Sequence, residues 1–114
     1  MHELSLATAL LDMVEDYAKR ERIDRVRSLK LSWGKYSGID PEAFKFLFSV
    51  QAEGTRAEGV ELVFDIRPAV FYCLTCEKEF TSRTFQATCS CCGGKDILLT
   101  GGTEELQLVE MEVD

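Results

Sequence analysis

Residues 73–92 read CLTCEKEFTSRTFQATCSCC and contain all five cysteines of this 114-residue chain. Cys73 and Cys76 form one Cys-x2-Cys pair, and Cys89 and Cys92 form a second pair after twelve intervening residues. Each such turn offers two thiolates at neighbouring corners of a tetrahedron, so two turns can close a four-coordinate zinc site. We therefore expect a structural Zn²⁺ at these four cysteines, because four protein ligands leave no coordination position for water.

The fifth cysteine, Cys91, lies inside the second pair. We assign Cys92 to the metal because Cys92-Gly93 is typical of a zinc knuckle, and exchange of Cys91 into the site stays open as an alternative. Phe80 and Phe85, between the pairs, are interpreted as a small core for this segment. The residues around them do not form the basic stripe that a nucleic-acid-binding zinc ribbon would present.

Composition and charge place the rest of the chain in the globular class. Hydrophobic residues make up 46% and charged residues 29%, and 13 Lys and Arg against 20 Asp and Glu give a net charge of −7. Such a surface repels phosphate backbones, so nucleic acid is not an expected partner, whereas cations or a basic protein patch suit it. No membrane-spanning stretch or signal peptide is apparent, so we expect a cytoplasmic protein in which thiols bind metal rather than form disulfides.

Hydrophobic periodicity predicts two helices and three strands on either side of the cysteine segment. Apolar residues follow one helical face over residues 3–21, and Asp40-Pro41-Glu42 is typical of the start of a second helix. Alternation predicts strands over three further segments, residues 26–33, 60–66 and 106–113. The expected fold class is α+β: two helices on a three-stranded sheet, mixed through a right-handed crossover, with an inserted zinc-ribbon-like module.

Two details of this fold are also predicted. In the last strand, Val109, Met111 and Val113 are expected to share one face, opposite Leu108, Glu110 and Glu112. The change in composition divides the chain into an α/β domain, residues 1–70 plus 100–114, and a zinc-binding module, residues 71–99.

The one histidine of the chain is residue 2. An isolated histidine near a terminus is usually solvated. Here the terminal amine, the His2 imidazole and neighbouring backbone amides lie within one chelating span, with the Glu3 carboxylate close by. Nitrogen-rich donor sets that can become planar suit Ni²⁺ or Cu²⁺ better than Zn²⁺. On chemistry alone, a metal site and a solvated terminus both stay open.

Four features occur together in this chain: residues 1–5 read MHELS, an amphipathic helix follows, residues 34–40 precede a second helix, and two Cys-x2-Cys pairs come late. In this combination the chain resembles, over essentially its whole length, the HypA/HybF family of nickel metallochaperones for [NiFe]-hydrogenase maturation. The resemblance implies that His2 is a nickel ligand and that the Met1 amine and the backbone around Glu3 complete the site. It also implies that the Glu3 side chain tunes nickel binding and contact with a partner GTPase.

The resemblance further implies partners and roles for other residues. A maturation GTPase of the HypB type and the hydrogenase large subunit are the expected partners, and the protein is expected to be a monomer or a weak homodimer. Asp40 falls near a position that some members place close to nickel, although Asp-Pro-Glu suits a helix cap at least as well. The four paired cysteines match structural zinc ligands. Family members usually have proline where this chain has Ser90, and many have glycine where it has Glu77.

These observations favour a nickel-delivery protein that is not an enzyme. The chain has no Gly-x4-Gly-Lys loop, so nucleotide energy would have to come from a partner. The alternative is a zinc-ribbon protein-interaction adapter with no N-terminal metal site. A thiol redox protein is less favoured, because zinc-bound thiolates are poor redox couples until the metal is released.

Overall fold

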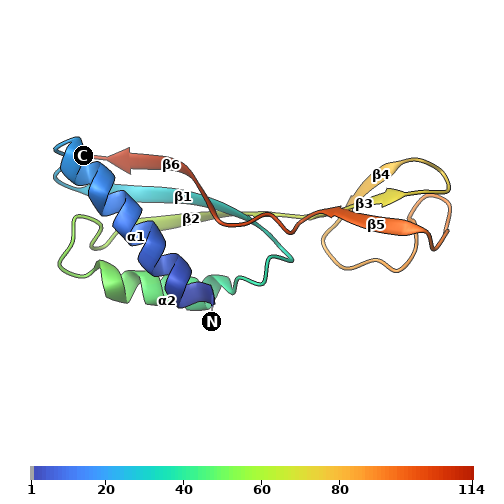
Figure 1. Ribbon diagram of the computed structural model, residues 1–114, viewed down its shortest axis with the longest axis horizontal. Helices are drawn as coiled ribbons and strands as arrows, with labels where there is room; N and C mark the ends of the chain where they lie inside the picture. Colours follow the sequence, from blue (N-terminus) through green and yellow to red (C-terminus); the bar gives the residue numbers. More distant parts are fainter. Residues whose placement is uncertain (1) are drawn as a thin grey trace. The chain divides into compact units, whose positions relative to one another are not determined.

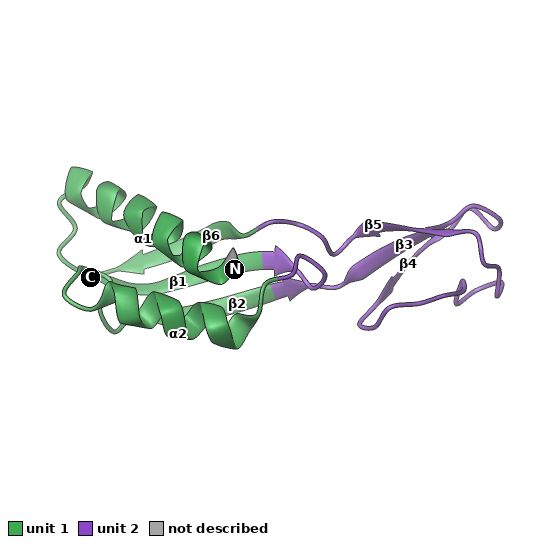
Figure 2. Ribbon diagram, turned by 60° about the horizontal axis from the view of Figure 1, so that its bottom comes forward, with its two compact units in different colours: residues 1–32, 39–65, 106–114 green, residues 33–38, 66–105 purple. Residues whose placement is uncertain are grey.

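The chain folds as two compact units. The computed structural model describes residues 2–114; the predicted nickel ligand Met1 and the side chain of His2 lie outside the described part. Unit 1 comprises residues 1–32, 39–65 and 106–114, and unit 2 comprises residues 33–38 and 66–105 (Figure 2). Residues 33–38, 66–70 and 100–105, which the sequence analysis assigned to the α/β domain, lie in unit 2.

Two helices, α1 (His2–Arg20) and α2 (Pro41–Ala52), pack against each other on one face of the unit 1 sheet (Figure 1). The predicted apolar face of α1 is buried except for Tyr17, which is 40% exposed. Asp40 caps α2: its Oδ1 accepts the N–H of Glu42 at 3.0 Å and that of Ala43 at 3.4 Å. The predicted helix start is therefore confirmed. Neither helix is long and apolar enough to cross a membrane within the described residues.

The unit 1 sheet has the order β2-β1-β6, from strands β1 (Val26–Gly34), β2 (Glu61–Arg67) and β6 (Gln107–Val113). β1 and β6 are antiparallel, whereas β1 and β2 run in the same direction and are joined through α2 (Figure 2). The sheet is thus mixed, and the predicted α+β class is confirmed. Its helix-covered face buries the inward residues of the unit 1 part of β1, which are Val26, Leu29 and Leu31.

The register of β6 against β1 contains an irregularity. Leu31 lies opposite Leu108 and Leu29 lies opposite Met111, with a shift between them that leaves Val109 without a place in the alternation. Val109 is 54% exposed, whereas Leu108 and Met111 are half-buried on the helix-covered side. The prediction that Val109 shares a face with Met111 is therefore wrong, because the extra residue inverts the pattern on one side of the bulge.

Unit 2 contains a second, antiparallel sheet in the order β4-β3-β5, from β3 (Ala69–Cys73), β4 (Glu79–Ser82) and β5 (Ile97–Gly101). Its core is aromatic. The buried Phe71 ring stacks on Phe80 at 5.3 Å between ring centroids and meets Phe85 edge-on at 5.9 Å, as expected of a small core. The sequence analysis did not predict these strands, because each is only four or five residues long and they lie around the cysteine turns.

Three segments of unit 2 meet at Gly34. Its N–H donates to the carbonyl of Glu104 at 2.9 Å, Lys35 N–H donates to Arg67 O at 2.9 Å, and Tyr36 N–H donates to Gly102 O at 2.6 Å. A Cβ at position 34 would lie 2.2 Å from the carbonyl carbon of Gly102. Glycine is therefore the only residue that fits at this crossing.

Candidate metal centres

The strongest candidate site is a cluster of four thiols in unit 2. The Sγ atoms of Cys73, Cys76, Cys89 and Cys92 all lie within 4.8 Å of one another. Cys73 Sγ and Cys92 Sγ are 3.7 Å apart, as are Cys76 Sγ and Cys89 Sγ. A regular tetrahedron with metal–sulfur bonds of about 2.3 Å has sulfur–sulfur edges of about 3.8 Å. The donor set therefore fits a tetrahedral metal ion, and the structure brings together the four cysteines that the spacing indicated.

Backbone N–H groups converge on these sulfur atoms. Cys73 Sγ accepts from Cys76 N at 3.4 Å, and Cys92 Sγ accepts from Gly94 N at 3.4 Å. Cys89 Sγ accepts from Cys91 N at 3.3 Å and from Cys92 N at 3.5 Å. Bonds of this kind favour the thiolate, which is the form that binds metal. The sequence analysis missed these donors, because nothing in a Cys-x2-Cys spacing shows where the backbone amides point.

The four thiols divide into two classes by acidity. Hydrogen bonds from the Cys92 and Cys91 N–H groups lower the pKa of Cys89 to about 6, and the Cys76 N–H lowers the pKa of Cys73. Burial raises the pKa of Cys76 to about 12. The pKa of Cys92 lies above its usual value. The Gly94 N–H lowers this pKa, but the neighbouring Cys73 thiol and burial raise it by more. The metal-free cluster therefore holds both thiolates and thiols near neutral pH.

The two turns differ in backbone strain. Glu77, directly after the first pair, has a φ of 55°, in the left-handed region that favours glycine. The second turn has Gly93 at a φ of 73° and Gly94 packed so closely that a Cβ would lie 3.3 Å from Cys92 Sγ. Cys91 is exposed and is not in the four-thiol group; it contributes its N–H to Cys89 instead of its sulfur.

Of the predicted nickel residues, Glu3 lies in the first turn of α1 and Asp40 directly precedes α2. Glu3 is only 7% exposed, and its Oε2 accepts the backbone N–H of Asp40 at 3.0 Å. The carboxylate of Asp40 is engaged in capping α2. The structure thus joins Glu3 to the residue that precedes α2, which anchors the first turn of α1 to the second helix. Glu3 and Asp40 are 37 residues apart in the chain, so this contact could not be predicted from the sequence.

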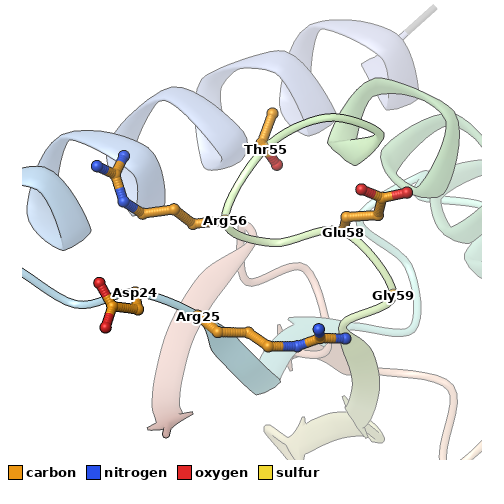
Figure 3. A pocket seen from close by; sticks show the side chains of 6 residues that line it. All are labelled: Asp24, Arg25, Thr55, Arg56, Glu58 and Gly59. Carbon is orange, nitrogen blue, oxygen red and sulfur yellow. The ribbon is translucent and has the colours of Figure 1, made fainter.

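A third feature of unit 1 is an open hollow of about 460 Å³ between the start of β1 and the loop after α2 (Figure 3). Its lining has both signs of charge, with Asp24, Arg25 and Glu58 among the labelled side chains. Arg56 is held by Glu15 through a 3.0 Å ion pair and a 2.6 Å bond to its backbone N–H. This balance of charges favours neither an anion nor a cation.

Comparison with known proteins identifies the family. Residues 1–113 match the profile described as "Hydrogenase/urease nickel incorporation, metallochaperone, hypA". The chain belongs to the HypA family. Among similar HypA family members, the hydrogenase maturation factor HypA of Syntrophus aciditrophicus is 45% identical and that of Caldanaerobacter subterraneus is 36% identical, each over 100% of both chains. The resemblance drawn from the sequence is therefore confirmed.

Solved structures of HypA have the same fold. One, described as the solution structure of HypA protein, superimposes with a TM-score of 0.69 at 23% identity and covers 99% of this chain and 96% of its own. The solution structure of the Ni metallochaperone HypA from Helicobacter pylori gives 0.62 at 21% identity, covering 97% and 96%. The HypA family is one of nickel metallochaperones in hydrogenase maturation, and the fold and the four-cysteine cluster of this chain agree with that assignment.

Proposed function

We propose that this protein binds Ni²⁺ at its N-terminus and delivers it, with a partner GTPase of the HypB type, to the large subunit of a [NiFe]-hydrogenase. The observation that carries the proposal is membership of the HypA family along residues 1–113. The nickel ligands would be the Met1 amine, the His2 imidazole and backbone nitrogen around Glu3. Asp40 is a further candidate, although its cap bonds already use its carboxylate.

The described backbone supports a nitrogen-rich site at this end. α1 begins at His2, so the backbone nitrogens around Glu3 lie in the first turn of the helix. The bond between the Glu3 carboxylate and Asp40 N–H occupies that side chain and fixes the first turn. We therefore propose that Glu3 contributes to nickel binding through its backbone and holds the site in place through its side chain.

Release of the cargo follows from the same arrangement. A shallow site at a helix start allows ligands to leave one at a time, so a receiving protein can replace them stepwise. The negative charge of the chain favours capture of the cation. No bond is made or broken in a substrate other than those to the metal, so we propose a carrier and not an enzyme.

We assign the four-thiol cluster to a structural Zn²⁺. Cys73, Cys76, Cys89 and Cys92 would hold it, and it would tie the two cysteine turns together beside the aromatic core of unit 2. All four coordination positions are then filled by protein, so the ion supplies stability and no open position for chemistry. A short acidic chain in a reducing compartment, as proposed here for the cytoplasm, keeps such thiolates available to metal.

The test is a nickel titration by calorimetry on the untagged protein, with zinc measured by mass spectrometry. His2→Ala removes the only imidazole of the chain, and Cys91→Ser serves as a matched thiol control. We expect saturable nickel binding that His2→Ala abolishes, with about one zinc retained in all three proteins. Equal or absent nickel binding in wild type and His2→Ala would leave the alternative, a zinc-ribbon interaction adapter.

A further inference from the structure

Cys91 lies outside the four-thiol cluster, yet it belongs to the same turn as two of the cluster cysteines. The structure describes all five cysteines, and only Cys91 and Cys92 are exposed. Cys73 and Cys89 are buried, and Cys76 is half-buried. A small reagent in solution therefore reaches Cys91 and Cys92 more readily than the other three thiols.

With a metal ion held by the cluster, Cys91 is the more reactive of these two exposed residues. The sulfur of Cys92 then shares an electron pair with the metal, whereas the sulfur of Cys91 stays free, because Cys91 is not in the four-thiol group. Peroxides oxidise accessible free thiols to sulfenic acids, and a sulfenic acid condenses with a neighbouring thiol to a disulfide. Cys91 is therefore the first sulfur that a peroxide is expected to oxidise.

Cys92 is the nearest cysteine in the chain, but it is a poor disulfide partner for Cys91. The peptide bond between the two residues is trans, so their Cα atoms lie about 3.8 Å apart. Disulfides usually join residues whose Cα atoms are about 4.4 to 6.8 Å apart, and a shorter separation strains the bond. A disulfide between Cys91 and Cys92 is therefore disfavoured.

Cys89 meets the requirement that Cys92 does not. Residues 90–92 form a turn, closed by a 2.9 Å hydrogen bond from the Gly93 N–H to the Cys89 carbonyl. Because Cys89 and Cys91 are two residues apart in a turn, their Cα atoms lie closer than the about 7 Å of an extended chain, which suits a disulfide. The Cys89 sulfur also lies beside residue 91, since it accepts the Cys91 N–H at 3.3 Å.

We propose that Cys91 is an oxidant-sensitive thiol that releases the metal by forming a disulfide with Cys89. Hydrogen peroxide first transfers an oxygen atom to the Cys91 thiolate, which gives a sulfenic acid and a hydroxide ion. The Cys89 thiolate then attacks the Cys91 sulfur, so that the S–S bond forms and the S–O bond breaks with release of a second hydroxide ion. The two sulfur atoms together lose two electrons, and the peroxide gains them.

Formation of this disulfide removes one of the four ligands. Cys89 supplies the sulfur that lies 3.7 Å from Cys76 Sγ, so its withdrawal breaks a link between the two cysteine turns. Three thiolates hold Zn²⁺ less tightly than four, and a competing chelator then removes the ion. A thiol reductant reverses the change, because it returns the disulfide to two thiols. This role of Cys91 rests on the assignment of Zn²⁺ to the cluster made above and does not depend on nickel binding.

The experiment uses the full, untagged, zinc-loaded chain, whose zinc content is measured before hydrogen peroxide is added. Zinc release is followed with a coloured chelator, and the remaining free thiols are then alkylated. Trypsin leaves Cys89, Cys91 and Cys92 in one peptide, residues 84–95, and fragmentation of that peptide by mass spectrometry locates the disulfide. We expect zinc release to accompany a disulfide between Cys89 and Cys91, with Cys92 alkylated, and a thiol reductant to restore zinc binding.

Two variants separate the position of the thiol from its presence. Cys91→Ser removes the thiol and keeps the backbone N–H, so zinc release by peroxide should be about fivefold slower. Thr88→Cys in the Cys91→Ser background provides an exposed position for a thiol directly before Cys89, where a disulfide would again join consecutive residues. This double variant is expected to release zinc as slowly as Cys91→Ser. Both variants should carry the same zinc content as the wild type before peroxide is added.

The proposal fails on any of four results. These are equal rates of zinc release in Cys91→Ser and the wild type, zinc retained while Cys91 is oxidised, a disulfide other than Cys89–Cys91 in the chain that has lost zinc, and fast release in the double variant. A chain that holds no zinc before peroxide is added would instead refute the zinc assignment, and this role of Cys91 with it.

Discussion

Glu77 is a non-glycine residue in a conformation that costs an L-amino acid about 1 kcal/mol or more. It follows Cys76 directly, so this strain lies within the turn that would hold the metal. We predict that Glu77→Gly raises the free energy of unfolding of unit 2 by roughly 1 kcal/mol and slows zinc loss to a chelator about fivefold.

Arg22 provides the matched control for that substitution. It also has a positive φ, of 57°, but lies after α1 in unit 1. Arg22→Gly is expected to stabilise the chain to thermal unfolding by a similar amount without changing the rate of zinc release. An equal effect of both variants on zinc release would contradict a local origin of the strain.

The acidities of the thiols predict how zinc affinity depends on pH. A metal displaces every proton that a ligand still carries, so Cys76, with a pKa of about 12, releases one throughout the physiological range. Cys89, with a pKa of about 6, is already a thiolate above that pH and releases a proton only below it. The affinity for zinc should therefore fall as the pH is lowered. A plot of the logarithm of this affinity against pH should be steeper by one proton below about pH 6, where zinc must also displace the proton of Cys89.

This dependence can be measured by chelator competition at a series of pH values. A slope that stays constant through pH 6 would show that the Cys89 N–H bonds do not lower its pKa.

Among the elements, α2 depends on its first residue. Asp40 supplies both cap bonds, so Asp40→Ala should cost about 1 kcal/mol in unfolding free energy, and Asp40→Asn should cost little because an amide oxygen can also cap. Chemical denaturation measures both. Nickel affinity that drops in Asp40→Asn while stability stays the same would indicate a metal ligand rather than a cap.

The elements also show which parts of the fold can be predicted from sequence. α1, β1, β2 and β6 were predicted to within about one residue at each end, and α2 at its start, because their apolar spacing or cap signals are strong. The bulge at Val109 was not predicted, because a one-residue irregularity arises from the pairing of β6 with β1 and leaves no signal in the local sequence. The short strands of unit 2 were not predicted for a related reason, because they pair with segments that lie far apart in the chain.

At the scale of the whole molecule, the crossing at Gly34 joins segments that the sequence separates widely. Gly34→Ala would force a Cβ to within 2.2 Å of the Gly102 backbone, so we predict a loss of about 3 kcal/mol or more in unfolding free energy and a lower zinc content after purification. Denaturant unfolding and metal analysis provide the measurements.

Gly54→Ala serves for comparison with that variant. Its φ is 81°, but a Cβ there would meet nothing within 4 Å, so only the backbone cost of about 1 kcal/mol is expected. If both alanine variants lose the same stability, crowding at the crossing is not the cause.

The candidate sites were predictable to different degrees. The spacing of the two Cys-x2-Cys pairs is enough to predict a metal site, and the structure brings those four sulfur atoms together. At the N-terminus the sequence indicated His2 and Glu3 but could not show that the Glu3 carboxylate is engaged by Asp40 N–H.

The order of segments in unit 1 has a consequence for synthesis. Its central strand β1 is made early, but its partner β6 follows residues 66–105, nearly all of unit 2. During synthesis, the edge of β1 that pairs with β6 therefore stays unpaired until the cysteine-containing insertion has left the ribosome. A disordered insertion makes closure of that long loop entropically costly, whereas an insertion already folded around its ion shortens the search. An ion bound at the four cysteines during translation would thus bring forward the completion of the nascent sheet.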